Sequence, residues 1–451
     1  MMMTAENSKE QGQTKRVILD GIKTFGEHTS LHGFRFFWGE NSSRLRRIIW
    51  IIFLLIVYCF LGCALIDSVA KFFKFPVSTV ISVTHHPNMT FPAVTICNHN
   101  VIRSSYVMDN ELLEETLKVI NTGDDIGYDW DSYDRHLATR DWNLTKLALE
   151  GAHRLEDMLL QCTWKTYENC NVDWFTTTVT DFGVCYTFNS EGNYSVTRAG
   201  SSYGLQLRIN IEQHKYSFSE FTGAGLRVLV HSHGERPLVK MAGFSVAPGF
   251  ATDVAIKRSS IWNLQAPYVP FCKDQIPKYS QIYTSDTCRF ECEVDEVIRL
   301  CGCKHYRYPG DVRPCDPKEH FHCVNTVLRN ANILDVEGCV CAEPCHMERF
   351  KTRISMAQWP SEYFSNIFAE VFNVTTEYVQ KNLLELNIYY EDLNSEEKSD
   401  SPAYNMFGFL GNIGGYFGLL CGASVVTIAE IIDCIMVTLS RVKNKKQRVS
   451  A

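Results

Sequence analysis

Two carboxylic acids, Glu430 and Asp433, lie inside an apolar stretch near the C-terminus, Leu419 to Ser440, that reads LLCGASVVTIAEIIDCIMVTLS. Acids three positions apart share one face of a helix, and burying them in lipid is costly. We therefore expect several copies of the chain to surround water, with these acids facing it and attracting cations. The alternative is that the acids only mark a helix end, but the apolar CIMVTL beyond them argues against it.

The small residues Gly422, Ala423 and Ser424 precede the two acids. Small side chains in membranes commonly form close helix-packing surfaces. At the centre of an oligomer they also let backbones approach closely, so that carbonyl and hydroxyl oxygens replace part of the hydration shell of a small hard cation. Taken alone, the motif leaves both interpretations open.

Two apolar segments are long enough to place these residues in a lipid bilayer. Ile48 to Ile66 has no charged residue and matches the roughly 20 residues that cross the hydrocarbon core. Met406 to about Leu439 is uncharged as far as Glu430 and longer than a straight span needs, so we expect it to be tilted or broken. Because basic residues flank both spans on their terminal sides, the positive-inside rule predicts that both termini are cytosolic. These residues are Arg44, Arg46, Arg47, Arg441, Lys443, Lys445, Lys446 and Arg448.

The predicted organisation therefore has five parts. They are a cytosolic N-terminus, 1–47, a first transmembrane helix, 48–70, an extracellular domain, 71–405, a second transmembrane helix, 406–440, and a cytosolic tail, 441–451. The charged run EDLNSEEKSDSP, Glu391 to Pro402, is predicted to be a solvated linker at the membrane surface.

Cysteines and sequons agree with an extracellular middle. The chain has 451 residues, a net charge of −7 and 18 cysteines, of which four fall in the spans and 14 lie between Cys97 and Cys345. An even number of cysteines outside the cell predicts disulfides; zinc binding by the CGC and CVC pairs is the disfavoured alternative, and we expect no metal or cofactor. Four sequons predict glycosylation at Asn88, Asn143, Asn193 and Asn373.

The middle of the chain mixes strand and helix patterns, which predicts an α+β domain. The strand candidates are Thr90–Asn98, Tyr203–Gln213 and Ala224–His233; NELLEETLKVIN and HRLEDMLLQC have helical spacing. We find no G-x-S-x-G elbow, P-loop or H-E-x-x-H motif and predict that the protein is not an enzyme. His231 and His233 are expected to be exposed. The acidic charge balance also disfavours binding to nucleic acid.

Several longer motifs carry a family resemblance. From about Leu31 to Asp433 the chain resembles the degenerin, epithelial sodium channel and acid-sensing ion channel family, most closely its acid-sensing branch. The matching stretches are LHG (31–33), TFPAVTICN (90–98), DMLLQC (157–162), CYTFNS (185–190), GFSVAPGF (243–250), CRFECEVDEVIRLCGC (288–303) and GNIGGYFGLLCGAS (411–424).

The resemblance implies a membrane protein with two transmembrane helices per subunit and a large disulfide-rich α+β extracellular domain, assembled as a trimeric channel. It implies a homotrimer or a heterotrimer with related subunits in the plasma membrane, permeable to Na⁺ and blocked by amiloride. Gly422-Ala423-Ser424 then resembles the selectivity filter. Other implied sites are the pore acids Glu430 and Asp433, the outer-pore residues Asn412, Gly414 and Gly415, and the re-entrant, gating pair His32 and Gly33.

Sequence alone cannot fix the pairing of so many cysteines, but spacing similar to the family's implies seven disulfides. These are Cys97–Cys185, Cys162–Cys170, Cys272–Cys345, Cys288–Cys341, Cys292–Cys339, Cys301–Cys323 and Cys303–Cys315.

The stimulus is where the chain departs from the acid-sensing branch. Family histidines fall on Pro76 and Val77, a family acidic pair falls on Asn325 and Arg329, and Asn412 replaces an aspartate. Protons stay the leading expectation, and the candidate sensors are His85, His86, Glu396 and Glu397. The alternatives are a peptide-gated or constitutively open channel, an ATP-gated trimer, for which no Lys and Arg cluster is found, and a cell-surface receptor or adhesion protein.

Overall fold

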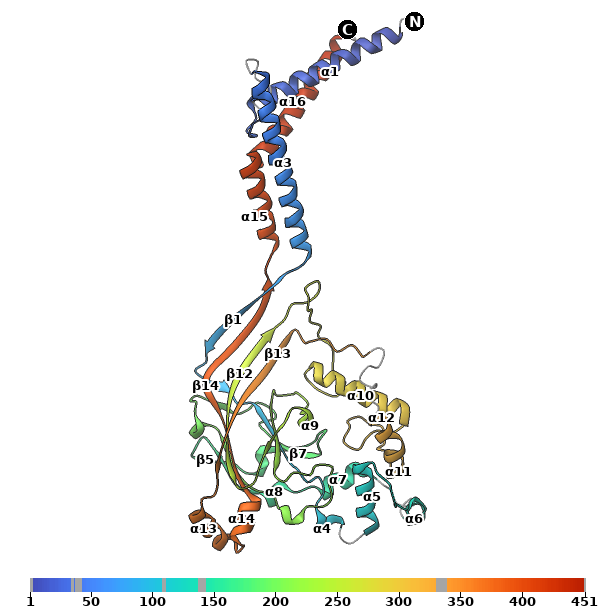
Figure 1. Ribbon diagram of the computed structural model, residues 1–451, viewed down its shortest axis with the longest axis vertical. Helices are drawn as coiled ribbons and strands as arrows, with labels where there is room; N and C mark the ends of the chain where they lie inside the picture. The colour runs from blue at the N-terminus through green and yellow to red at the C-terminus, as the bar shows by residue number, and fades with distance from the viewer. Residues whose placement is uncertain are drawn as a thin grey trace. The chain divides into compact units, whose positions relative to one another are not determined.

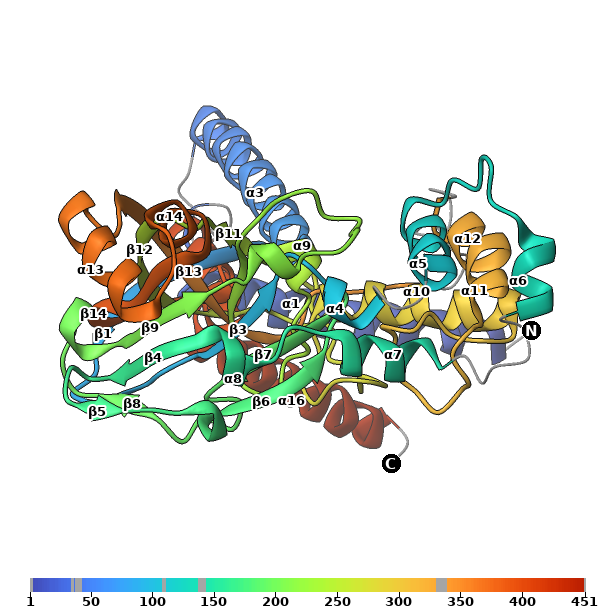
Figure 2. The same cartoon turned by 90° about the horizontal axis from the view of Figure 1, so that it is seen from below.

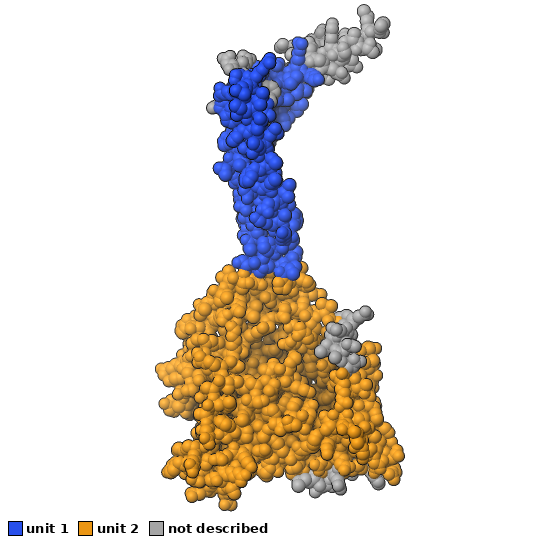
Figure 3. Space-filling model, in the orientation of Figure 1, with its two compact units in different colours: residues 1–78, 267–269, 401–451 blue, residues 79–266, 270–400 orange. Residues whose placement is uncertain are grey.

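The computed structural model describes residues 3–33, 36, 43–107, 111–136, 143–329 and 339–449. The chain forms two compact units, which Figure 3 shows in different colours. The helical unit comprises residues 1–78, 267–269 and 401–451, and the β-rich unit comprises residues 79–266 and 270–400.

Among the described residues, four helices and one π-helical turn build the helical unit. They are α1 (Met3–His28), α3 (Arg44–Phe73), α15 (Met406–Tyr416), the π-helical turn η6 (Phe417–Cys421) and α16 (Val425–Val449). Within this unit α3 packs against α15, and α1 packs against α16 (Figure 1). Ser43 caps α3 by accepting a hydrogen bond from the Arg46 N–H, which satisfies one of the free donors at the helix start.

One described helix, α3, is by itself long and apolar enough to cross a membrane, and it contains the predicted first span. The second predicted span is broken. Met406–Cys421 and Val425–Lys443 satisfy the same criterion only as a pair, and their axes differ by 67°. The break explains why the apolar segment is longer than one straight span requires.

Two larger sheets and one small ribbon form the β-rich unit. The seven-stranded sheet has the order β13-β12-β14-β9-β4-β5, and β1 also pairs with β14. Its strands are β1 (Val77–His85), β4 (Leu159–Trp164), β5 (Glu168–Asn169), β9 (Leu205–Asn210), β12 (Phe250–Trp262), β13 (His346–Gln358) and β14 (Leu383–Pro402). β12 and β14 run parallel, and the other described pairs with assigned direction are antiparallel.

The second sheet has the order β11-β10-β3-β7-β6, and the ribbon is β2-β8. The strands are β2 (Met89–Thr90), β3 (Ala93–Asn98), β6 (Phe175–Val179), β7 (Val184–Phe188), β8 (Ser195–Val196), β10 (Leu226–His231) and β11 (Phe244–Val246). The core between the sheets is dominated by aliphatic and aromatic side chains, with Phe91, Trp164 and Phe188 in mutual ring contact.

Helices surround the sheets of the β-rich unit (Figure 2). They are α4 (Ser104–Val107), α5 (Glu111–Thr122), α6 (Trp130–His136), α7 (Leu144–Gly151), α8 (Leu155–Met158), α9 (Val239–Ala242), α10 (Ser285–Cys301), α11 (Pro317–Glu319), α12 (Asn325–Arg329), α13 (Glu362–Phe372) and α14 (Thr376–Asn382). A π-helical turn, η4 (His320–Val324), joins α11 to α12, and short 3-10 turns are η1 (Val172–Trp174), η2 (Ser201–Tyr203) and η3 (Gln213–Lys215).

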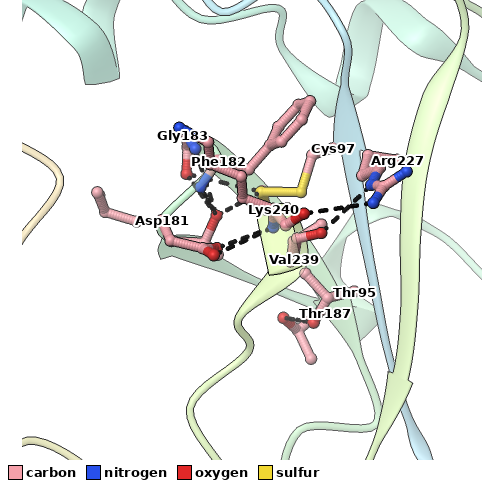
Figure 4. Close-up of a disulfide and its surroundings, with 12 residues drawn as sticks. Thr95, Cys97, Asp181, Phe182, Gly183, Thr187, Arg227, Val239 and Lys240 are labelled. Carbon is pink, nitrogen blue, oxygen red and sulfur yellow. Dashed lines mark hydrogen bonds between the residues drawn. A yellow bond between two sulfur atoms is a disulfide. The ribbon is translucent and has the colours of Figure 1, made fainter. Parts of the chain in front are cut away.

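Seven disulfides cross-link the β-rich unit, and they are the seven pairings that the family resemblance implied. Five of them staple α10 and its flanking segments. Cys97–Cys185 joins β3 to β7 beside the turn in which Asp181 accepts the Lys240 N–H (Figure 4). The sulfur atoms of Cys288, Cys292, Cys339 and Cys341 come close enough to suggest a metal site, but they form two of the disulfides and are not free thiolates.

The three predicted strands are present as β3, β9 and β10, and the first predicted helix is α5. The second predicted helix is wrong beyond Met158, because the chain changes there from α8 into β4 and pairs with β9. His231 was expected to be exposed but is buried, since its Nε2 hydrogen bonds to the Thr95 Oγ1 inside the sheet at 2.8 Å.

The predicted linker, Glu391 to Pro402, is also wrong. This run is the second half of β14, the longest strand of the structure that is described. Its charges are paired across the sheet: Arg353 contacts Glu391 at 2.9 Å, and Lys351 contacts Glu396 at 3.0 Å. Strand pairing with β12 and β1 and these ion pairs outweigh the linker-like composition.

The close approach of β9 and β14 gives a test of the fold. A Cβ on Gly204 would lie 2.0 Å from the Ile388 carbonyl oxygen, so Gly204→Ala must displace backbone and should cost about 1–3 kcal/mol. Such a loss lowers protein abundance several-fold, which surface biotinylation measures. Gly223→Ala is the matched control, since its Cβ would meet only ordinary contacts. Equal surface levels for the two variants would contradict the described register.

Candidate functional site

The break in the second span is centred on Gly422. The π-helical turn ends at Cys421, and Gly422 adopts the left-handed conformation with φ of 66°. Glycine suits this conformation because it has no Cβ. The Ser424 N–H then donates to the Thr427 Oγ1 at 3.0 Å, which starts α16. The predicted filter residues are therefore the non-helical link between two helices.

The predicted His-Gly pair lies against this break. The His32 N–H donates to the Cys421 carbonyl oxygen at 2.8 Å, and a Cβ on Gly422 would be 2.5 Å from the His32 ring. Gly33 has φ of 82°, and its Cβ would be 2.9 Å from the Leu54 side chain of α3. The structure thus brings His32, Gly33 and Gly422 together, and the left-handed conformation of both glycines disfavours residues with a Cβ.

Glu430 and Asp433 line one cavity of about 260 Å³ together with residues of α1, including Gly21 and Thr24. Both acids therefore project from one side of α16, as their spacing predicts. Their partners differ. Glu430 accepts hydrogen bonds from the segment just after α1, whereas the Asp433 carboxylate has no hydrogen-bond or ion-pair partner among the described residues.

The predicted outer-pore residues lie on α15. Asn412 is exposed, and its Nδ2 donates to the Tyr404 hydroxyl at 2.9 Å. Gly414 and Gly415 are also exposed, and a Cβ at either position would meet nothing within 4 Å in this chain. Space at these glycines is therefore available to another subunit or to water.

The candidate proton sensors lie in the β-rich unit, along the pairing of β1 with β14. His85 Nδ1 hydrogen bonds to the Asn394 Oδ1 at 3.1 Å, and His86 Nε2 hydrogen bonds to the Ser395 Oγ at 2.7 Å. Protonation of either ring changes which of its nitrogens can accept. Both rings thus contact side chains of β14.

Glu396 is a candidate sensor only if neighbouring acids raise its pKa, and the structure does not meet this condition. Its nearest charged neighbours are Lys351, at 3.0 Å, and Lys398, at 3.6 Å. The hydrogen bond from Lys351 holds the pKa of Glu396 below its usual range. Glu397 lies opposite Ser260 of β12. Glu396 therefore stays ionised in mild acid.

Sequence reasoning missed a cavity of about 770 Å³ bounded by α5, α9, α10 and α12. Here Asn325 donates to the Ile120 carbonyl, and Arg329 donates to the Thr122 and Gly123 carbonyls at 2.9 Å. These carbonyls end α5, where a cation is favourable. The contacts involve no group that titrates in mild acid, so this attachment of α12 to α5 is independent of pH there.

The histidines of the same cavity do not sense mild acid either. His305 and His320 are buried with their ring centroids 4.7 Å apart. Burial, followed by the charge of Arg307, lowers the pKa of His320 to about 3. Both rings therefore stay neutral when the pH falls from 7.4 to 5.

A buried polar network centred on Glu212 was also missed, because its members are far apart in the sequence. His153 Nδ1 donates to the Glu212 carboxylate at 3.2 Å, and Lys215 donates to the same group. Burial alone would raise the pKa of Glu212, but these hydrogen bonds outweigh it and lower the pKa to about 2. Glu212 is therefore a structural anion at physiological pH.

The four predicted glycosylation sites are accessible. The side chains of Asn88, Asn143, Asn193 and Asn373 are all exposed. The Asn143 Oδ1 also caps α7 by accepting the Lys146 N–H at 3.0 Å. Glycosylation keeps this oxygen, so the cap and a glycan are compatible.

Comparisons with known proteins agree with this arrangement. Acid-sensing ion channel 1C from Danio rerio is 32% identical over 463 residues, which cover 96% of this chain and 86% of that protein. Acid-sensing ion channel 1 from Gallus gallus is 30% identical over 91% of this chain and 83% of its own length. Acid-sensing ion channel 2 from Homo sapiens is 30% identical over 92% of this chain and 86% of its own length.

Residues 25–434 match the profile of a family described as amiloride-sensitive sodium channel. The match includes the His32-Gly33 turn, all seven disulfides and the break at Gly422. With this match and its relatives at about 30% identity, the chain belongs to the amiloride-sensitive sodium channel family, which consists of membrane ion channels and not of enzymes.

Proposed function

We propose that three copies of this chain, or copies with related subunits, form a sodium-permeable, amiloride-sensitive channel of the plasma membrane that extracellular protons open. Both termini are cytosolic, and residues 71–405 are extracellular. The observation that carries the proposal is the glycine-dependent break at Gly422–Ser424, which the His32-Gly33 turn supports. A helix broken inside a membrane is tolerated where it lines a water-filled path.

In this proposal an entering cation passes first the filter residues and then the two acids. Oxygen atoms at Gly422–Ser424 replace part of the hydration shell of Na⁺, and the acids on the cytosolic side raise the local cation concentration. A single pair of spans cannot enclose such a path, so the assembly is needed. The number three rests on the family resemblance.

Protons are the proposed stimulus because the relatives reported above are named acid-sensing channels. The proposed sensors are His85 and His86, whose rings contact Asn394 and Ser395 of β14. Protonation charges both rings beside β14, whose C-terminal end continues into α15.

A peptide-gated or constitutively open channel is the second candidate. The observation that favours it is the pH-independent attachment of Arg329 and Asn325 to α5, at positions where the acid-sensing branch carries an acidic pair. A cell-surface receptor or adhesion protein would share the two spans and the disulfides but would carry no current.

The deciding experiment records whole-cell current from cells that express this chain alone, first at pH 7.4, then at about pH 5, and then with amidated peptides at pH 7.4. A cation current that appears in acid and is blocked by amiloride supports the proposal. Current at rest or only with peptide supports the second candidate. The absence of current under all conditions, with normal surface expression, contradicts a channel formed by this chain alone.

The filter gives a specific prediction. Ser424→Ala removes the hydroxyl oxygen and should lower the Na⁺/K⁺ permeability ratio, while Gly422→Ala should do so more strongly because its Cβ would overlap the His32 ring. Reversal potential measures the ratio. Gly411→Ala on α15 is the control, since its Cβ meets nothing within 4 Å. An unchanged reversal potential in both filter variants would assign the motif to helix packing.

The proposed proton sensors give a second prediction. Replacing His85 and His86 together by asparagine should shift half-activation to lower pH, on the order of 0.5 unit, because uncharged amides do not respond to acid. Asn325→Ala and Arg329→Ala should leave half-activation in place, since neither position titrates in this range. Dose-response curves between pH 7.4 and 5 measure these values. Identical curves for the histidine variant and the original chain would exclude both residues as sensors.

A further inference from the structure

Glu430 has three hydrogen-bond donors from one short segment, Thr29–Gly33, which follows α1. Its Oε2 accepts from the Thr29 Oγ1 at 3.1 Å, from the Ser30 N–H at 3.1 Å and from the Ser30 Oγ at 3.3 Å. Hydrogen bonds to an ionised acceptor are stronger than neutral ones. The carboxylate is therefore occupied as an anchor for this segment.

The anchor is connected to the filter through two hydroxyl groups. Ser424 donates its N–H to the Thr427 Oγ1 at 3.0 Å, and the Thr427 and Ser30 hydroxyls are 2.8 Å apart. Thr427 is 2% exposed. Because the carboxylate only accepts, the Ser30 hydroxyl must donate to it, and the Thr427 hydroxyl then donates to Ser30. Each group in the series Ser424, Thr427, Ser30 therefore donates its hydrogen bond to the next one, and Ser30 donates to Glu430.

The same segment reaches the break by a second route. Two residues after Ser30, the His32 N–H binds the Cys421 carbonyl, and the His32 ring covers Gly422. Release of the segment from Glu430 would therefore loosen both the hydroxyl chain at Ser424 and the cover over Gly422.

We propose that Glu430 is a positioning residue that holds segment Thr29–Gly33 under the filter, and that Asp433 is the acid that meets permeant cations. The proposal rests on the channel function proposed above. The carboxylate of Asp433 is exposed and, within the described chain, has no partner, so its charge is available to ions. The two acids of the motif thus have separate roles.

Variants at Glu430 separate its acceptor from its charge. Glu430→Gln keeps an acceptor oxygen without the charge, and Glu430→Ala removes both. Loss of a hydrogen bond to a charged group should shift the equilibrium between the bound and the released segment about tenfold. We therefore expect Glu430→Ala and Ser30→Ala to lower the Na⁺/K⁺ permeability ratio about twofold or more. Glu430→Gln should lower the ratio less than Glu430→Ala does, because the amide oxygen can still accept from Thr29 and Ser30.

Matched controls test the remaining roles. Asp433→Asn should lower single-channel conductance and leave the permeability ratio unchanged. Thr29→Val should lower the ratio, while Thr24→Val should not, because the Thr24 hydroxyl lines the same cavity but donates to the Asp20 carbonyl. The double variant Ser30→Ala, Glu430→Ala should be no worse than the more severe of the two single variants.

A chemical-modification assay tests the positioning role of Glu430 without a recording of current. Cys421 is buried, and its backbone carbonyl accepts the His32 N–H. The rate at which a cytosolic thiol reagent modifies Cys421 therefore reports on whether the segment is in place. With Cys59, Cys63 and Cys434 replaced by serine, Glu430→Ala and Ser30→Ala should raise this rate about tenfold, and Glu430→Gln should restore protection.

Equal rates in all variants, or equal defects in Glu430→Gln and Glu430→Ala, would overturn the positioning role. A conductance loss in Glu430→Gln as large as that in Asp433→Asn would assign Glu430 to the permeation path instead. If no variant carries current, the proposed channel function fails, and the modification rates alone decide whether Glu430 holds the segment.

Discussion

A helix that breaks inside a membrane leaves backbone groups without intrahelical partners, and lipid offers none. In this chain the His32 N–H, from a segment before the first span, pairs with the Cys421 carbonyl at the break. This pairing brings the segment that contains His32 and Gly33 close to the break. A Cβ at position 33 would overlap Leu54, and a Cβ at position 422 would overlap His32, so glycine suits both positions. The segment around His32 and the break in the second span therefore form one structure.

Three sites of the β-rich unit hold charged groups in fixed contacts. Lysines bind Glu396, Arg329 binds the end of α5, and Glu212 is held as an anion. A family with acid-sensing members thus includes a chain in which several charged groups are held by specific partners.

Sequence patterns predicted the spans, the broken second helix and the α+β domain because each depends on local composition or period. The disulfide pairings came from family spacing. The strand at Glu391–Pro402 was missed because its charges look solvated until Lys351 and Arg353 of β13 lie beside them. The partners of Glu430 were missed for the same reason: Thr29 is 401 positions away, and no local signal marks the pair.

The distance between Thr29 and Glu430 along the chain also sets an order of events during synthesis. A ribosome that adds roughly 5–20 residues per second needs about 20–80 seconds to pass from one residue to the other. The segment around Thr29 is therefore made first and waits, without its partner, until Glu430 has been synthesised. A truncated product that stops before residue 430 cannot form this contact, so the N-terminal segment of a nascent chain lacks its anchor until that point of translation.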